Sequence, residues 1–304
     1  MASANGTTHA HESVIIGVAY IVSSLILLLI YVSFNALLKK NREFNSMQAH
    51  RLMLFLGVLD CIQLVGHVFG GVATIWRNIN DDAPYLCQIV GAMLNSAWNG
   101  LFPLSLLIAV QRFFTVRRRV NVNEKFSLAM KVVISLCFAY CFAFFVSLVC
   151  IGKVIYSPNK FSWSYGSDTA SKFLAKTEVV VSASCVVLTF LVYIAIVIII
   201  YKKKNGIKKM RRNEMQLLVQ ATILFLLLAS IISLWHYHGL VLPETMWTNF
   251  SINICWIVYC GLNPILYLIF SKSIRLAYLR FIRILAPKEN VVIALQIVVT
   301  RSRY

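Results

Sequence analysis

Charged residues are scarce in this chain. They make up 13% of its 304 residues, hydrophobic residues make up 59%, and the mean hydropathy is +0.75. A soluble globular domain carries about twice that share of charge, so this composition excludes one. Apolar runs of the ~20 residues that cross a bilayer recur instead. We expect one all-α membrane domain with seven spans: Val14–Leu38, Arg51–Trp76, Leu86–Phe114, Leu128–Gly152, Phe173–Tyr201, Gln216–Leu242 and Trp247–Phe270.

Other features are missing as well, and each absence narrows the function. The first apolar run is too long for a signal peptide and lacks a small-residue cleavage site, so we interpret it as a span. The chain has no internal repeat, which gives no support to the inverted-repeat plan of many transporters. It has no nucleophile–base pair and no metal-ligand spacing, so we expect neither an enzyme nor a metal or cofactor site.

The basic residues are concentrated in alternate loops. The net charge is +18, and 24 of the 29 Lys and Arg residues fall in three loops and the tail on one side of the predicted spans. This is the positive-inside pattern, which predicts an outside N-terminus and an inside C-terminus. Nucleic acid is therefore not an expected partner, whereas anionic lipid or an acidic protein is. We expect an extracellular segment at 1–13, the seven-span domain at 14–270, and a cytoplasmic amphipathic helix with a short tail at 271–304.

Three polar residues of the second expected span lie on one helical face. We interpret Asp60 as the only acidic residue deep in a span and count no second one. Gln63 and His67 follow at i+3 and i+7, so the three form a polar stripe. Ionisable groups in lipid are costly and usually functional, which favours a hydrogen-bonding or ion-binding centre at Asp60. Simple packing against a neighbouring amide is the alternative, and it is the favoured interpretation for Gln63 and His67.

The third expected span carries a second polar group. In "LNSAWNG", Asn95 and Asn99 are at i and i+4, with Trp98 beside them. They lie at the depth of a pocket that opens to the outside. An amide contact between helices explains the same pattern equally well.

The sixth span ends near Trp235, His236 and His238, which suit either a pocket or an interfacial aromatic belt. The two histidines are two positions apart, so they do not face each other on a helix and no shared metal is predicted. Arg112 ends the third span on the inner side, where an arginine ordinarily extends its charge to the membrane surface.

The spacing of these residues changes the interpretation of Arg112. It lies 25 positions after Cys87, Asp60 lies in a leucine-rich second span, and "NPILY" ends the seventh span. This set, in order and in seven crossings, resembles the rhodopsin-like G-protein-coupled receptors. Their third helix starts at a cysteine and ends at an arginine, their second helix holds a buried aspartate, and their seventh helix ends in NPxxY.

Two further stretches narrow the resemblance. "HRLMLFLGVLDCIQLVGH" and the outer-loop "FSWSYGSD" are most similar to nematode serpentine chemoreceptors, either the srt-like or the srx-like group. The resemblance implies an odorant-type receptor in the plasma membrane, with the sensory cilium as a further expected location. Its partners would be a small external ligand, a heterotrimeric G protein and membrane lipid.

The resemblance also assigns roles in activation. Pro264 would weaken the seventh helix locally, and Asn263 would satisfy freed backbone or reach Asp60. Tyr267 would swing toward Arg112 in the active state.

Two further elements would complete the inner side. Tyr193, in the fifth span, would join the cluster around the arginine. The basic stretch from Ile274 to Arg283 would lie along the inner leaflet. The residues expected to face lipid are Ile274, Tyr278, Phe281 and Ile282.

The chain departs from the family pattern at several positions. Gln111 replaces the acidic neighbour of the arginine, which removes an ionic restraint and favours high basal activity. Tyr237 stands where a proline follows the sixth-helix tryptophan, Trp235. The outer loop 153–172 has no cysteine, so Cys87 lacks its usual disulfide partner and Cys150 is the only substitute we identify.

The leading hypothesis is therefore a chemosensory receptor that binds a small, mostly apolar ligand in the outer half of the bundle. The expected ligand-binding residues are Asn95, Trp98, Asn99, His67 and Trp256. The seventh span has no lysine for a retinal Schiff base, which disfavours a light receptor. A proton- or ion-coupled transporter centred on Asp60 is the alternative, although it would need a polar path across the bundle. Asn5-Gly6-Thr7 is a glycosylation sequon in the outer segment.

Overall fold

The computed structural model describes residues 2–42, 44, 48–118, 127–202, 212–243 and 245–285. Seven of the described helices are long and apolar enough to cross a membrane. They coincide with the seven predicted spans to within a few residues at each end, so the predicted seven-helix fold is confirmed. The elements are α1 (Ala2–Lys40), α3 (Gln48–Ile75), α4 (Ile79–Asp82), α5 (Pro84–Arg118), α6 (Leu128–Cys150), β1 (Val154–Ser157), β2 (Ser162–Tyr165), α7 (Thr169–Lys202), α9 (Arg212–Val241), α10 (Met246–Phe270) and α11 (Lys272–Leu285).

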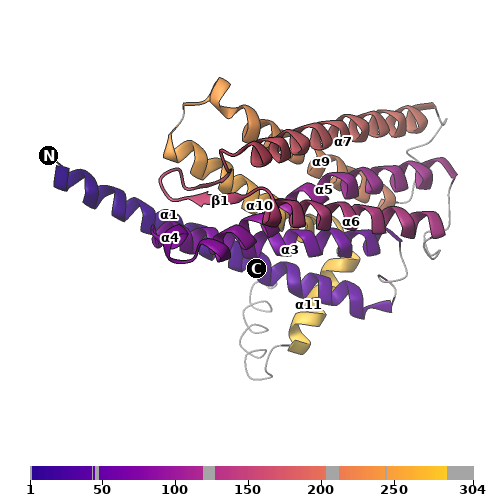
Figure 1. Cartoon of the computed structure of the whole chain (residues 1–304). Coiled ribbons are helices and arrows are strands. Elements are labelled where there is room, and N and C mark those ends of the chain that lie inside the picture. Colours follow the sequence, from indigo (N-terminus) through magenta and orange to yellow (C-terminus); the bar gives the residue numbers. More distant parts are fainter. Residues whose placement is uncertain are drawn as a thin grey trace.

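The long helices run side by side, and α11 turns away from their common direction (Figure 1). The hairpin of β1 and β2 lies at one end of the bundle, which we call the hairpin end. α11 packs against the last turns of α1 and α10 at the other end, which we call the α11 end. Helices α3, α5 and α10 are the most buried of the seven. They therefore form the centre around which the other four are arranged.

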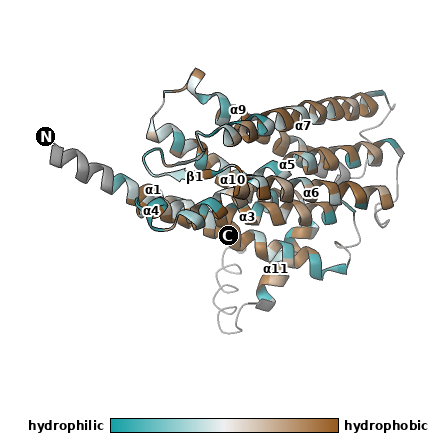
Figure 2. Ribbon diagram, in the orientation of Figure 1, coloured by the Kyte–Doolittle hydropathy of each residue, from teal (hydrophilic) through white to brown (hydrophobic). Residues whose placement is uncertain are grey.

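The outward faces of the peripheral helices are largely apolar. Figure 2 shows hydrophobic residues along α6 and α7. On α7, Val180, Phe190 and Val197 are each more than half exposed. A water-soluble protein does not leave such a continuous apolar surface uncovered. This surface is the one expected to contact lipid.

The hairpin was not predicted from the sequence. Val154 pairs with Tyr165 and Ser157 with Ser162 in an antiparallel ladder. Phe161 in the connecting turn has a φ of 52°, which is unusual for a residue with a bulky side chain.

Burial and hydrogen bonds offset this backbone strain. The Phe161 ring is buried, and its carbonyl accepts hydrogen bonds from the Tyr20 hydroxyl and from Asn253 Nδ2, both at 3.2 Å. The turn is thus attached to α1 and α10 at the same point.

Helix α7 starts at a well-defined cap. Both carboxylate oxygens of Asp168 accept from Ser171, one from its backbone N–H and one from its hydroxyl, at 2.8 Å each. These hydrogen bonds lower the pKa of Asp168, because they favour its charged form. The cap fixes the start of α7 directly after the hairpin, and it thereby positions Glu178 in the third turn of the helix.

The structure corrects the predicted orientation of the amphipathic helix. Ile274 and Tyr278 are buried rather than turned to lipid, and they pack with Phe34 and Leu38 of α1. The Tyr278 hydroxyl lies 2.7 Å from the Ser33 hydroxyl. The short connection after α10 brings this face against α1, which a helical pattern alone does not reveal. The apolar side chains exposed on α11 are Leu276, Leu279 and Ile282, while Phe281 is partly buried.

Candidate functional site

A cavity of about 400 Å³ opens at the hairpin end, between the hairpin, α5, α9 and α10. Its walls combine tryptophan rings with amide and hydroxyl groups. The residues that line it are Leu94, Asn95, Val154, Asn159, Lys160, Ser162, Trp163, Ser164, Tyr165, Trp235, His238, Thr245, Met246, Asn249, Ile252 and Trp256. A concave site of mixed apolar and polar lining is typical of small-molecule binding.

Trp256 of α10 joins this cavity to the centre of the bundle. Its ring centroid lies 4.6 Å from that of His67, 4.9 Å from Trp98 and 5.0 Å from Trp235. Its indole Nε1 donates to Gln63 Oε1 at 2.8 Å. One side chain is therefore in contact with the cavity, with three neighbouring aromatic rings and with the polar stripe of α3.

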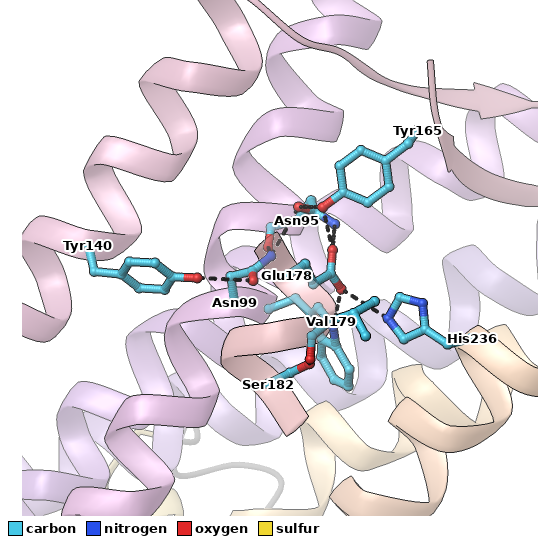
Figure 3. Close-up of polar contacts among 9 residues, drawn as sticks. Asn95, Asn99, Tyr140, Tyr165, Glu178, Val179, Ser182 and His236 are labelled. Carbon is cyan, nitrogen blue, oxygen red and sulfur yellow. Dashed lines mark hydrogen bonds and ion pairs between the residues drawn. The ribbon is translucent and has the colours of Figure 1, made fainter. Parts of the chain in front are cut away.

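A second polar cluster lies beside the cavity and centres on Glu178 of α7. The Glu178 side chain is fully buried, and it accepts from Trp98 Nε1 at 3.1 Å, from Asn95 Nδ2 at 3.2 Å and from the Tyr165 hydroxyl. His236 Nε2 of α9 lies 3.8 Å from the same carboxylate. Figure 3 shows these groups converging from several helices and from β2.

Tyr165 of β2 lines the cavity and donates to Glu178. Burial, together with the negative charge of Glu178, raises the pKa of Tyr165, so its hydroxyl keeps its proton at neutral pH. The hydroxyl also lies 2.8 Å from Asn95 Oδ1, and Asn99 donates to that same oxygen at 3.2 Å. A cavity-lining tyrosine on the hairpin thus shares a hydrogen-bond network with a buried carboxylate.

Glu178 corrects the sequence interpretation, which treated Asp60 as the only acidic residue deep in a span. Both are buried, on α7 and α3 respectively. The signal was present, because an acidic residue within the apolar run "KTEVVVSASC" is itself a candidate functional group. His236 was considered as a pocket residue, but its contact with Glu178 was not foreseen.

Asp60 is the centre of the polar contacts in the middle of the bundle. Its Oδ2 accepts from the Tyr31 hydroxyl at 2.6 Å and from Asn263 Nδ2 at 3.3 Å. The sequence-based expectation that Asn263 reaches Asp60 agrees with this contact. Tyr31 was missed, because a tyrosine in a first span has no pattern that distinguishes it from an interfacial residue.

A smaller cavity, of about 50 Å³, lies toward the α11 end. It brings together Arg112, Tyr193, Asn263 and Tyr267, which the sequence analysis grouped in one activation cluster. Pro264 is buried inside α10 directly after Asn263.

Arg112 is the charged side chain in the wall of this cavity. Gln111, its neighbour in the chain, donates to the Thr115 hydroxyl at 3.2 Å. Among the residues that the structure describes, no carboxylate forms an ion pair with Arg112.

The five residues predicted to bind ligand have different positions in the structure. Asn95 and Trp256 line the hairpin-end cavity. His67, Trp98 and Asn99 are buried behind it, where they contact Trp256, Glu178 and Asn95 respectively. The cavity also includes residues that the sequence did not indicate, above all Trp163 and Tyr165 of the hairpin. Asn5 lies within α1, and Val291–Thr300 lies outside the described residues.

The suggested pairing of Cys87 with Cys150 is not formed. Both cysteines are free thiols. Cys87 is buried and its Sγ donates to the Ile79 carbonyl of α4 at 3.5 Å, whereas Cys150 is exposed at the end of α6. The two sulfur atoms have different surroundings, and a disulfide would need them about 2 Å apart.

The fold and these sites define the class of protein. The structure is similar to the crystal structure of squid rhodopsin, with a TM-score of 0.64 over 88% of this chain and 84% of that chain. Sequence identity between the two is 13%, so the similarity shows the fold alone. The chain is a seven-span membrane protein with the fold of a G-protein-coupled receptor.

The family follows from the sequence as a whole. Residues 2–291 match the family described as serpentine type 7TM GPCR chemoreceptor Srt, and the chain belongs to that family. This confirms the predicted resemblance and selects the srt-like group over the srx-like one. No curated protein sequence matches the chain. Family and fold are those of a receptor rather than of an enzyme.

Proposed function

We propose that this receptor binds a small external ligand in the hairpin-end cavity and activates a heterotrimeric G protein at the α11 end. The observation that carries the proposal is the position of Trp256, which lines the cavity and donates a hydrogen bond to Gln63 on α3. Any ligand that fills the cavity contacts this ring. The lining of tryptophans, amides and hydroxyls suits a small, weakly polar molecule.

The hairpin end faces outside in this proposal. The loops and the tail that carry most of the basic residues follow from the other ends of the spans, and basic loops are cytoplasmic. Residues 1–13 are then extracellular and 271–304 cytoplasmic, with α11 at the inner surface. Asn5 is a glycosylation site on the outer segment. The plasma membrane is the proposed location, with the sensory cilium as its specialised region.

The mechanism begins at Trp256. A ligand that binds one position of this ring better than another shifts the population toward that arrangement. The ring is linked through Gln63 to α3, three residues from Asp60, which in turn holds Asn263. Pro264 follows Asn263 and removes one backbone hydrogen bond from α10. The helix is therefore weakened next to the residue that contacts Asp60.

The smaller cavity at the α11 end lies beside this part of α10. Tyr267 and Tyr193 line it with Arg112, so movement of α10 alters the surroundings of the arginine. Arg112 and the basic inner loops form the proposed G-protein face. Because Gln111 does not restrain Arg112, we expect coupling even without ligand.

The transporter alternative would need a polar path across the bundle, and Glu178 adds a second buried acidic group to Asp60. Membership in a receptor family outweighs this observation, because Glu178 is already bonded to three donors at the hairpin end. We therefore interpret it as part of the frame of the ligand cavity.

Energy transfer between the receptor and tagged G-protein α subunits tests the proposal. The receptor is tagged at its tail and expressed with a panel of subunits, beside Arg112→Ala and the control Arg77→Ala near the hairpin end. We expect a nucleotide-sensitive signal for at least one subunit, a loss of most of that signal in Arg112→Ala, and no change in Arg77→Ala. If no subunit gives a signal at normal surface expression, even with a broad odorant panel, the receptor proposal is wrong.

A further inference from the structure

Arg112 is an unusual charge for the interior of this bundle. It is only 7% exposed, and its Nε has no hydrogen-bond partner among the described residues. A buried charge without compensation is strongly destabilising, so buried cations are normally paired. The family position that would supply an acid is Gln111, which bonds to Thr115 instead.

Five of the residues that line the cavity beside Arg112 carry hydroxyl groups, and Gln220 and Asn263 add amides, while the rest of the lining, apart from Arg112, is apolar. Four hydroxyls, from Ser105, Thr189, Tyr193 and Tyr259, line it without a hydrogen bond to any described residue. Tyr267 adds a fifth hydroxyl next to the guanidinium. Hydroxyl groups facing a polar cavity can all donate to a negatively charged occupant.

No acidic side chain belongs to the described lining of this cavity. Asp60 is linked to the cavity through Asn263, which lines it. Its Oδ2 already accepts hydrogen bonds from Tyr31 and Asn263. The described lining therefore carries one positive charge, on Arg112, together with several hydroxyl groups that can donate hydrogen bonds.

The size of the cavity limits the occupant. Its volume of about 50 Å³ exceeds the ~10–15 Å³ that one water molecule requires. It has room for a monatomic anion with one or two waters. A halide accepts hydrogen bonds from all sides, which matches donors that come from α5, α7 and α10.

We propose that this cavity is a binding site for a small monovalent anion, of which chloride is the physiological example. The anion takes the role of the missing acidic neighbour, because it neutralises Arg112 and accepts from the surrounding hydroxyls. The site holds α5, α7 and α10 together at the α11 end. The proposal concerns the receptor itself and requires neither its external ligand nor a G protein.

The test uses the purified full-length receptor in detergent, without a G protein. Its thermal midpoint is measured while chloride replaces gluconate at constant ionic strength. Binding to the folded state alone raises the midpoint along a saturating curve, and we expect a rise of about 3 °C or more. Bromide should replace chloride, while gluconate, which exceeds the cavity, should not.

Matched variants assign the effect to the cavity. Arg112→Gln should lose the chloride-dependent rise, whereas Arg117→Gln, an exposed arginine on the same helix, should keep it. Tyr193→Phe removes one donor with little change in packing, and it should raise the half-saturating chloride concentration by about tenfold. This milder variant decides the matter if Arg112→Gln does not fold. A response to chloride that is absent in the wild type, non-saturating, or unchanged in both Arg112→Gln and Tyr193→Phe would overturn the proposal.

Discussion

Replacing Glu178 with leucine is expected to remove most of the receptor from the cell surface. The change takes away the shared acceptor of Trp98, Asn95 and Tyr165, and it leaves the Trp98 and Asn95 donors without their acceptor, while Tyr165 keeps only Asn95 Oδ1. Each buried donor left unsatisfied costs ~1–3 kcal/mol, so the loss of this acceptor is expected to destabilise the bundle strongly. The measurement is surface expression, together with the thermal midpoint of the purified receptor.

Two controls separate this cause from a general sensitivity of α7. Lys176→Leu introduces the same residue at an exposed position two residues earlier, and it should behave as the wild type. Glu178→Gln keeps the size and one acceptor oxygen, so its midpoint should lie between the two. A Glu178→Leu receptor as stable as Lys176→Leu would show that the cluster in Figure 3 does not stabilise the bundle.

Replacing Gly91 with alanine should disrupt the packing of the hairpin on α5. A Cβ at this position would lie 2.1 Å from the Val154 carbonyl oxygen and 3.0 Å from the Trp163 ring. The first contact is with backbone, so α5 and β1 must move apart. Overpacking of this kind costs ~1–3 kcal/mol, and the backbone contact places Gly91→Ala at the upper end. We expect a lower thermal midpoint and loss of any response to an external ligand.

Gly70→Ala is the matched control for this prediction. Its Cβ would lie 3.2 Å from Trp163 Nε1 and 3.5 Å from Tyr156, which are side-chain atoms that can shift slightly. Gly70→Ala therefore also introduces a methyl group against the hairpin, but from α3 and with a much milder steric contact. Equal stability of the two variants would contradict the close approach of Val154 to α5.

The sequence was sufficient for the features that depend on long patterns. Seven spans follow from apolar length alone, because backbone groups in lipid must be satisfied within helices. The contact of Asn263 with Asp60 and the grouping of Arg112 with Tyr193 and Tyr267 agree with the resemblance to rhodopsin-like receptors.

Other features depend on contacts between distant segments, and no local pattern reveals them. The hairpin is four residues per strand, and it is held by Tyr20 and Asn253 through the Phe161 carbonyl. Neither residue is near the hairpin in sequence. In the same way, Ile274 and Tyr278 read as lipid-facing on an isolated helix, and only the docking of α11 on α1 buries them.

The ligand residues illustrate a third limit. His67, Trp98 and Asn99 were chosen by depth and polarity, which do not distinguish a wall of the cavity from the layer behind it. The hairpin supplies Trp163 and Tyr165 to the wall, so its absence from the prediction shifted the expected site inward.

The central claim is that the hairpin-end cavity controls the α11 end through the hydrogen bond between Trp256 and Gln63. A double-mutant cycle with Trp256→Phe and Gln63→Leu tests it most directly, read as energy transfer to the coupled G-protein subunit. We expect each single variant to lower the signal, and the double variant to be no worse than the more affected single one. Two results would contradict this mechanism. One is a double variant whose loss of signal equals the sum of the two single losses, and the other is single variants that give the wild-type signal.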